Sequence, residues 1–185
     1  MNMQTSPAAG WARGGRQPSI AIIGAGMSGI AAVVKLRKAG YTDLTVYEKA
    51  DRVGGTWREN TYPGLSCDVP SAWYSFSFAL KSDWSHRYSY GPEIQAYMES
   101  VADDFDVTPI IRFNTPVTDL TWEAPGWRLT TGDGEQSVFD IVISATGILH
   151  HPAYPDIEGL DTFKGNVSTP PAGTTAWTTK ANALV

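Results

Sequence analysis

The sequence predicts an α/β protein of the doubly wound class, with a parallel sheet and a small antiparallel β insert. Three observations predict this fold: a short apolar run at 19–23, a helical segment that ends at Gly40, and a second apolar run at 44–48. A glycine-rich turn joins the first run to the helix. Strand, turn, helix and strand in this order make a βαβ unit, which is typical of parallel sheets. With 185 residues, 42% of them hydrophobic, the chain can bury one core.

The hydrophobic pattern of the remaining segments predicts a loop, a helix and several strands. Residues 49–92 lose any period and are rich in Gly, Pro, Ser, Trp and Tyr, so we expect a long loop with a functional role. Residues 92–105 regain helical spacing and begin with a proline, which suits a first helical turn. Short strands are expected after this helix, and we interpret them as a small antiparallel ribbon. They lie at 110–113, 117–122, 127–130 and 138–144, with a Gly-Asp-Gly turn before the last one.

Composition excludes several classes of function. The net charge of −5 and the pI near 5.1 favour neither nucleic acid nor an anionic bilayer as a partner. No apolar run approaches the roughly 20 residues of a membrane span. The single cysteine, Cys67, excludes an intramolecular disulfide framework and a cysteine-rich zinc site, and we expect no metal. Residues 1–18 read as a disordered leader without the apolar core of a secretory signal, so a cytoplasmic location is expected.

A glycine motif predicts a nucleotide site at the end of the first strand. Gly24 permits a tight turn, Gly26 allows the backbone to approach a pyrophosphate, and Gly29 allows the helix to pack closely on the strand. Ala25, Met27 and Ser28 fill the intervening positions, whose N–H groups would face the phosphates. Glu48 follows Gly29 by 19 positions, where a carboxylate can accept the ribose hydroxyls and would repel a 2′-phosphate. The alternative is a glycine-rich turn that binds nothing.

A second glycine pair favours FAD over NAD. Gly54 and Gly55, followed by Thr56 and Trp57, come six residues after Glu48. Such a pair allows the backbone to approach a longer dinucleotide without a side chain in the way. NAD remains the alternative, in which case the chain is a small dehydrogenase.

Three further motifs carry a family resemblance. They are Tyr62-Pro63-Gly64-x-x-Cys67-Asp68, the aromatic run at 73–78, and Ser144-Ala145-Thr146-Gly147. Together with the two glycine motifs, these residues resemble the N-terminal FAD-binding portion of Baeyer–Villiger monooxygenases, which are class B flavin monooxygenases. The resemblance covers residues 19 to about 167.

The resemblance implies a reaction and a set of site residues. NADPH would reduce FAD, O2 would give a C4a-peroxyflavin, and this would convert a ketone to an ester or lactone, or oxidise a heteroatom. An aspartate matching Asp68 pairs in the family with an arginine from the NADPH half, which makes Asp68 the candidate catalytic residue. Trp57 and Tyr74 either line the flavin ring or are simple core aromatics. The implied cofactor contacts are Gly24, Ala25, Gly26, Met27, Ser28, Gly29, Glu48, Lys49, Gly54, Gly55, Thr56, Trp57, Asp68, Tyr74, Val117, Ala145, Thr146 and Gly147.

The resemblance also implies a domain plan that breaks near residue 168. Residues 19–149 would form the FAD-binding domain and 150–167 a linker toward a missing NADPH domain. The family fingerprint F-x-G-x-x-x-H-x-x-x-W starts at Phe163 and Gly165, but Thr169 and Gly173 stand at its last two positions. Residues 168–185 therefore read as a tail foreign to the family. Our hypothesis is that one base was lost in the codon of Ser168, because the shifted frame permits FHTARWDHGLDYEGKRVG, which restores both His and Trp.

We expect weak FAD binding and no turnover from these 185 residues alone. The alternatives are a non-catalytic flavin-binding remnant and a flavin monooxygenase that oxidises nitrogen or sulfur. The substrates would be small ketones or heteroatom compounds.

Overall fold

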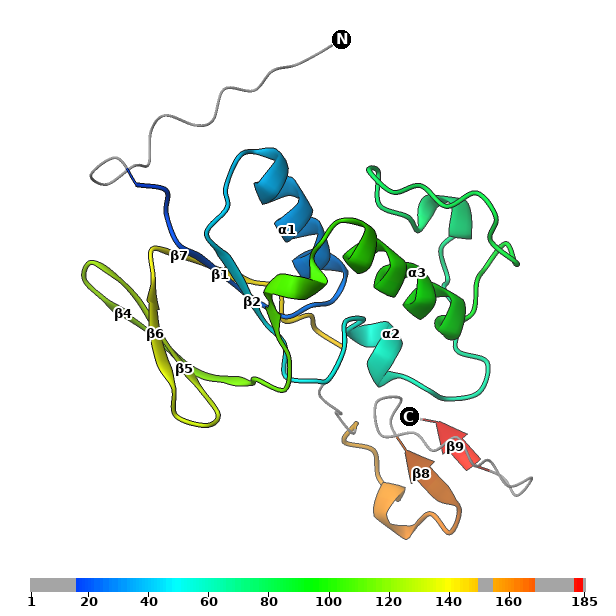
Figure 1. Cartoon of the computed structure of the whole chain (residues 1–185). Helices are drawn as coiled ribbons and strands as arrows, with labels where there is room; N and C mark the ends of the chain where they lie inside the picture. Colours follow the sequence, from blue (N-terminus) through cyan, green and yellow to red (C-terminus); the bar gives the residue numbers. More distant parts are fainter. Residues whose placement is uncertain (1–15, 150–154, 169–181, 185) are drawn as a thin grey trace. The chain divides into compact units, whose positions relative to one another are not determined.

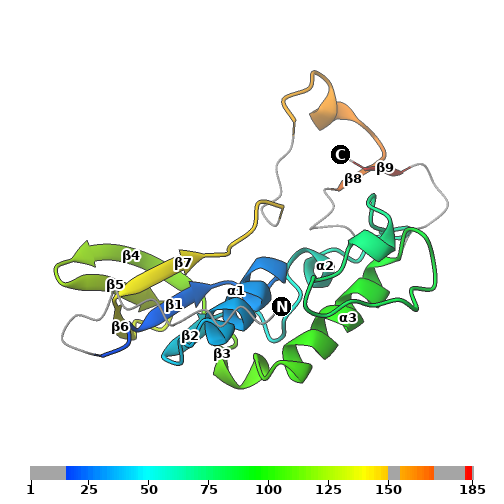
Figure 2. The same cartoon turned by 90° about the horizontal axis from the view of Figure 1, so that it is seen from above.

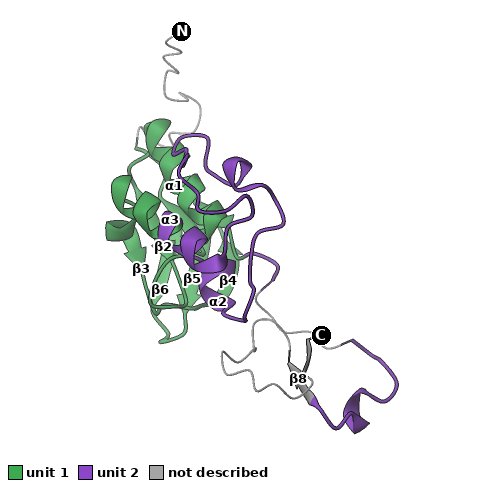
Figure 3. Cartoon of the chain, turned by 90° about the vertical axis from the view of Figure 1, so that its right-hand side faces the viewer, with its two compact units in different colours: residues 1–53, 98–146 green, residues 54–97, 147–185 purple. Residues whose placement is uncertain are grey.

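The computed structural model describes residues 16–149, 155–168 and 182–184, and these residues form two compact units. Unit 1 comprises residues 1–53 and 98–146, and unit 2 comprises residues 54–97 and 147–185 (Figure 3). The strands are β1 Ile20–Ile23, β2 Leu44–Tyr47, β3 Ile111–Arg112, β4 Val117–Glu123, β5 Gly126–Thr131, β6 Gln136–Phe139, β7 Ile141–Ser144, β8 Asn166–Ser168 and β9 Asn182–Leu184. The helices are α1 Met27–Lys38, α2 Thr56–Glu59 and α3 Gly91–Asp104, with 3-10 turns η2 Ser71–Trp73, η3 Thr108–Ile110 and η4 Leu160–Thr162.

Unit 1 contains the predicted parallel sheet. Its strand order is β3-β2-β1-β7, and β1 pairs in parallel with both β2 and β7 (Figure 1). The crossover from β1 to β2 is α1, whose last turn carries Lys35, Arg37 and Lys38, a favourable placement at the negative end of the helix dipole. Gly40 follows the helix at φ +92°, as its role as a C-terminal stop requires. The α/β class and the βαβ unit are thus confirmed.

Two apolar faces form the core of unit 1. On the face toward α1, Ile22 lies 3.8 Å from the position that a Cβ atom on Gly29 would take. On the opposite face, Ala21 and Tyr47 pack against Leu129 and Phe139 of the antiparallel sheet β4-β5-β6. Figure 2 shows this second sheet beside β1 and β7, away from α1. Both layers therefore fix the position of the carboxyl ends of β1 and β2.

Two of the expected ribbon strands lie elsewhere, which corrects the prediction. Residues 111–112 form β3 and pair in parallel with β2, so they belong to the main sheet. The run expected at 138–144 is two strands, because the chain turns at Asp140 from β6 into β7. The Asp140 carboxylate accepts hydrogen bonds from the backbone N–H and the hydroxyl of Ser19, at 2.8 and 3.0 Å. This contact holds the start of β7 beside β1.

The predicted leader is partly ordered. Arg16 forms an ion pair with Asp140 at 2.8 Å, and the Gln17 side chain donates to the carbonyl of Gly40. Pro18 is buried. Residues 1–15 of the predicted leader lie outside the described residues, as do 150–154 of the predicted linker and 169–181 and 185 of the predicted tail.

Unit 2 organises the predicted loop with few regular elements. The segments 66–71 and 87–90 run side by side, since Cys67 and Ser71 donate backbone hydrogen bonds to Ser89 and Arg87. The Ser71 hydroxyl is buried and lies 2.8 Å from the Ser89 hydroxyl. Tyr97 of α3 accepts the N–H of Phe76 at 2.8 Å through its hydroxyl, which ties the aromatic run to the helix. Hydrogen bonds from side chains and between backbone segments therefore hold this part of the chain, which has few regular helices or strands.

No helix in the described ranges is long and apolar enough to cross a membrane. Within the same ranges, no three His, Cys, Asp or Glu side chains gather closely enough to hold a metal ion.

Candidate dinucleotide site

The candidate site begins at the switch point of the parallel sheet. The chain leaves β1 toward β2 on one side, and β7 pairs on the other side, so the strand order reverses between β1 and β7. Ligands of doubly wound sheets bind at the carboxyl ends of strands at such a point. The glycine turn, Glu48 and Ala145 directly follow the carboxyl ends of β1, β2 and β7.

The first glycine is required by its backbone and by its neighbour. Gly24 has φ +104°, and a Cβ atom there would lie 2.5 Å from the carbonyl oxygen of Ala145. A Cβ atom on Gly29 would lie 1.9 Å from the carbonyl oxygen of Gly24. Two of the three predicted roles therefore have direct steric support: the tight turn at Gly24 and the close packing at Gly29.

The N-terminus of α1 is open to an anion. Gly26 caps the helix with no side-chain hydrogen bond, and the first turn contains no acidic residue. The first N–H groups of a helix have no partner within the helix, and they carry the positive end of its dipole. The 12-residue helix thus directs the N–H groups of Met27, Ser28 and Gly29 as a pyrophosphate site requires.

Glu48 is a buried carboxylate fixed by two backbone groups. It is 4% exposed. Its two oxygens accept N–H groups from Ala25 at 2.8 Å and from Ala50 at 3.0 Å. The first bond joins the end of β2 to the glycine turn after β1. An ionised carboxylate only accepts hydrogen bonds, so its chemistry suits a ribose hydroxyl as the donor.

Two other predicted contacts lie near this end of β2. Thr115 donates its N–H to the backbone carbonyl of Glu48 at 2.9 Å, and Val117 begins β4 two residues later. Val117 also packs on the core cluster of the second face. Lys49 is exposed directly after Glu48, and Thr146 is exposed directly after Ala145. The structure therefore brings the unit 1 candidates together at one edge.

In unit 2, the second glycine pair has a packing reason. Gly54 has φ +131°, and a Cβ atom there would lie 1.9 Å from the side-chain oxygen of Gln95 on α3. Gly55, at φ +54°, precedes α2, in which Thr56 and Trp57 are the first residues. Sequence reasoning missed Gln95, which is a buried polar residue within the apolar stripe of the helix. A buried amide on such a stripe is the signal that indicates a close backbone neighbour.

Trp57 and Tyr74 form one pair in unit 2. The indole N–H of Trp57 donates to the Tyr74 hydroxyl at 3.0 Å, and the rings meet edge to face at 5.6 Å. Burial raises the pKa of Tyr74, and the hydrogen bond from Trp57 opposes that rise. Both side chains are partly buried. Because its pKa is raised, the Tyr74 hydroxyl stays protonated and can donate a hydrogen bond.

Asp68 is exposed, and it lies between the buried Cys67 and the exposed Val69. The Cys67 sulfur accepts the N–H of Val69 at 3.4 Å, so the thiol serves this turn. Gly147 is exposed at φ +71°, and a Cβ atom there would meet nothing within 4 Å.

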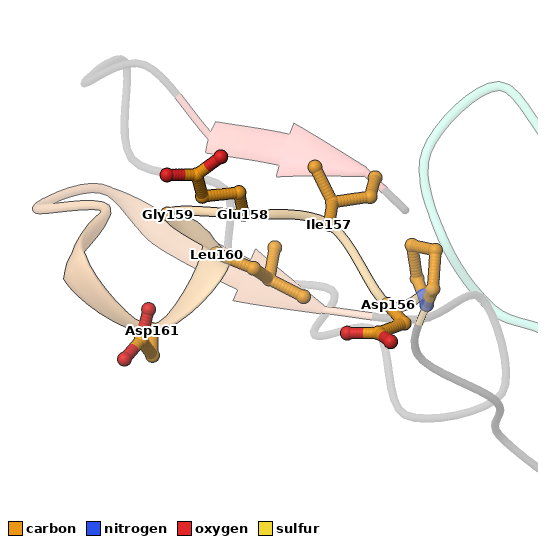
Figure 4. A pocket seen from close by; sticks show the side chains of 7 residues that line it. Asp156, Ile157, Glu158, Gly159, Leu160 and Asp161 are labelled. Carbon is orange, nitrogen blue, oxygen red and sulfur yellow. The ribbon is translucent and has the colours of Figure 1, made fainter.

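A shallow hollow elsewhere in unit 2 is a poor site. Seven consecutive residues, Pro155–Asp161, line it. Figure 4 shows that the carboxylates of Asp156, Glu158 and Asp161 point apart. One turn of chain without converging polar groups does not make a binding site.

Several known proteins are similar to this chain in sequence and in fold. A family model described as an NAD(P)-binding Rossmann-like domain matches residues 22–101. A Baeyer-Villiger monooxygenase of Streptomyces coelicolor is 48% identical over 150 residues, which are 80% of this chain and 29% of the relative. The open crystal structure of cyclohexanone monooxygenase superposes with a TM-score of 0.74 at 38% identity, over 85% of this chain and 32% of that one.

The chain is homologous to the N-terminal portion of Baeyer–Villiger monooxygenases. An uncharacterized monooxygenase of Mycobacterium tuberculosis is 50% identical over 153 residues, 83% of this chain and 31% of the relative. The chain thus spans about a third of the length of the Baeyer–Villiger monooxygenases and other curated relatives it matches. The family resemblance and the α/β fold predicted from the sequence are confirmed.

Proposed function

We propose that the chain is the FAD-binding portion of an NADPH- and O2-dependent monooxygenase that converts ketones to esters or lactones. The observation that carries the proposal is the Glu48 carboxylate, held 2.8 Å from the N–H of Ala25 beside the glycine turn. A buried acid at the end of the second strand, joined to a glycine turn at the first, is the arrangement that recognises the adenosine half of a dinucleotide.

The residues present fit FAD. The turn Gly24–Gly29 would hold the pyrophosphate and Glu48 the ribose, because a Cβ atom at Gly24 would clash and the first turn of α1 carries no acid. We propose the unit 2 candidates, from Gly54 to Tyr74, as further contacts of the cofactor. FAD supplies the redox and oxygen-activating chemistry when bound. In this proposal the Trp57–Tyr74 pair offers a hydroxyl donor, and Asp68 supplies a negative charge near the reacting centre.

The second cofactor and the substrate extend the same proposal. A steroid monooxygenase bound to NADP superposes with a TM-score of 0.70 at 36% identity, and it covers 84% of this chain and 31% of its own. Similar proteins named cyclohexanone, steroid and ketocytochalasin monooxygenase support a small-molecule substrate, for which we propose a ketone. We propose that the NADPH site lies largely in the portion of the relatives that this chain does not match. We propose that the 185 residues alone bind flavin without oxidising NADPH, and a cytoplasmic location remains a prediction.

A titration tests the proposal directly. The purified chain is titrated with FAD and, separately, with NADH, while flavin and protein fluorescence are followed. We expect saturable FAD binding in the micromolar range or weaker, and at least tenfold weaker NADH binding. A Gly24→Val variant should lose FAD binding, whereas Gly134→Val, at a turn where a Cβ atom meets nothing within 4 Å, should retain it. Equal binding of NADH, or FAD binding unaffected by Gly24→Val, would reject the proposal.

A further inference from the structure

The glycine pair before α2 forms a tight turn whose shape favours glycine. Gly55 has φ +54° and ψ −120°, the conformation of the first central residue in a type II′ turn. The N–H of Trp57 donates to the carbonyl of Gly54 at 3.2 Å, which closes the turn. The turn therefore determines where α2 begins and where the backbone of Trp57 lies.

Gln95 of α3 packs directly against this turn. It is 8% exposed, and the position that a Cβ atom on Gly54 would take lies 1.9 Å from its side-chain oxygen and 2.7 Å from its side-chain nitrogen. The hydrogen that Gly54 carries in place of a side chain thus faces the amide. Close-packed interiors transmit such contacts, because they contain few voids into which a neighbour can move. Gln95 therefore limits how closely the turn can approach the helix.

Tyr97 of the same helix holds the segment that carries Tyr74. Tyr97 is 7% exposed. Its hydroxyl accepts the N–H of Phe76 at 2.8 Å and donates to the carbonyl of Ala79 at 2.7 Å. The rings of Phe76 and Tyr97 also stack, with their centroids 5.9 Å apart. Since Tyr74 lies two residues before Phe76, its segment is attached to α3 by hydrogen bonds and by a ring contact.

We propose that Gln95 and Tyr97 are positioning residues, which hold the aromatic pair of the candidate cofactor site in its bonded arrangement. In that pair, the indole N–H of Trp57 donates to the Tyr74 hydroxyl at 3.0 Å, and the two rings meet at 78°. Such a bond depends on both distance and direction, and its two partners come from segments that α3 holds separately. The inference rests on the proposed function, in which this pair contacts FAD.

A measurement without cofactor tests the positioning directly. The indole N–H signal of Trp57 is followed by NMR in the isotope-labelled 185-residue chain and is assigned by its loss in Trp57→Phe. Gln95→Ala and Tyr97→Phe should each shift this signal and speed its exchange with solvent at least fivefold, because the bond to Tyr74 loosens. Gln95→Met, which keeps an unbranched side chain of similar length, should leave the exchange within twofold.

Two matched controls lack these contacts. Gln136→Ala on β6 removes an exposed glutamine, and Tyr88→Phe removes the hydroxyl of a tyrosine that is 43% exposed. Both variants should leave the Trp57 signal and its exchange unchanged.

The affinity for FAD gives a second readout. FAD and ADP are titrated separately, because ADP lacks the flavin half and the proposed function assigns it to the glycine turn of unit 1. Gln95→Ala should weaken FAD binding at least fivefold and leave ADP binding within twofold. In a Trp57→Ala chain, the same substitution should weaken FAD binding less than twofold, because the pair through which Gln95 acts is gone.

Three results would overturn the inference: an unchanged Trp57 signal in both variants, equal weakening of FAD and ADP binding, or an effect of Gln95→Ala on FAD binding that Trp57→Ala does not reduce. A chain that binds neither FAD nor ADP rejects the proposed function, and the NMR result then still decides whether α3 positions the pair.

Discussion

At the scale of single residues, Glu48 joins two strand ends through one carboxylate. It accepts the N–H groups of Ala25 and Ala50 while it is nearly excluded from solvent. The same group thus fixes the shape of the turn, and in the proposed function it also recognises a ribose. Loss of either acceptor should be visible both in stability and in binding.

Glu48→Gln tests this double role. The amide keeps one acceptor oxygen but turns an NH2 group toward the other backbone N–H, which leaves a buried donor without its partner. We expect a loss of about 1–3 kcal/mol in the free energy of unfolding, and at least tenfold weaker FAD binding. Urea titration and flavin fluorescence measure the two effects. The control is Glu123→Gln on β4, at an acid that is exposed. If Glu48→Gln matched that control in both measurements, the account of Glu48 would fail.

Substitutions at two glycines of unit 2 distinguish the cost of backbone strain from the cost of a steric contact. Gly54 and Gly64 both have positive φ, but only at Gly54 would a Cβ atom meet a neighbour, the Gln95 side chain at 1.9 Å. Gly64→Ala should cost about 1–2 kcal/mol from strain alone. Gly54→Ala should cost about 1–3 kcal/mol more, and Gln95→Ala in the same chain should recover part of that difference. Equal losses at both glycines, measured by urea unfolding, would contradict the close contact.

At the scale of elements, a turn, helix or strand could be predicted from the sequence when the residues that determine it lie within a few positions of one another. The turn after β1, helix α1 and Gly40 were predictable because positive φ, close approach and helix termination each demand a residue type within a few positions. The division of 138–144 was not, since the apolar pattern continues across Asp140 while the pairing partner changes. Ile141 pairs with Ile20, about 120 positions away, and no local pattern encodes that contact. Gln95 was missed for the same reason, because its neighbour Gly54 lies on another element.

Asp140 makes the start of β7 sensitive to acid. The ion pair with Arg16 and the hydrogen bonds from Ser19 lower the pKa of Asp140 from 3.8 to about 2. A carboxyl whose pKa is lower in the folded chain contributes stability above its unfolded pKa. That contribution is lost as the pH falls from about 4 toward 2. Urea unfolding at pH 5 and pH 2.5 should therefore show a smaller difference for Asp140→Asn than for the unchanged chain. An unchanged difference would show that the contact does not hold β7 in place.

At the scale of the whole molecule, the chain combines a portion similar to Baeyer–Villiger monooxygenases with a tail that lacks the His and Trp of the family fingerprint. We propose that one base is lost in the codon of Ser168, so that residues 169–185 are read in a shifted frame. Resequencing the gene across that codon should reveal the base and a long frame with the missing His and Trp. A confirmed sequence without an extra base would contradict the proposal.

We propose that the β1–α1 turn and Glu48 of unit 1 recognise the adenosine pyrophosphate half of a dinucleotide. The most direct measurement is competition against bound FAD, with ADP as one competitor and FMN, which lacks the adenosine half, as the other. We predict that ADP displaces FAD from the chain and that FMN at the same concentration does not. Displacement by FMN and not by ADP would contradict the claim, because it would place recognition on the flavin ring and its ribityl phosphate instead of on the glycine turn.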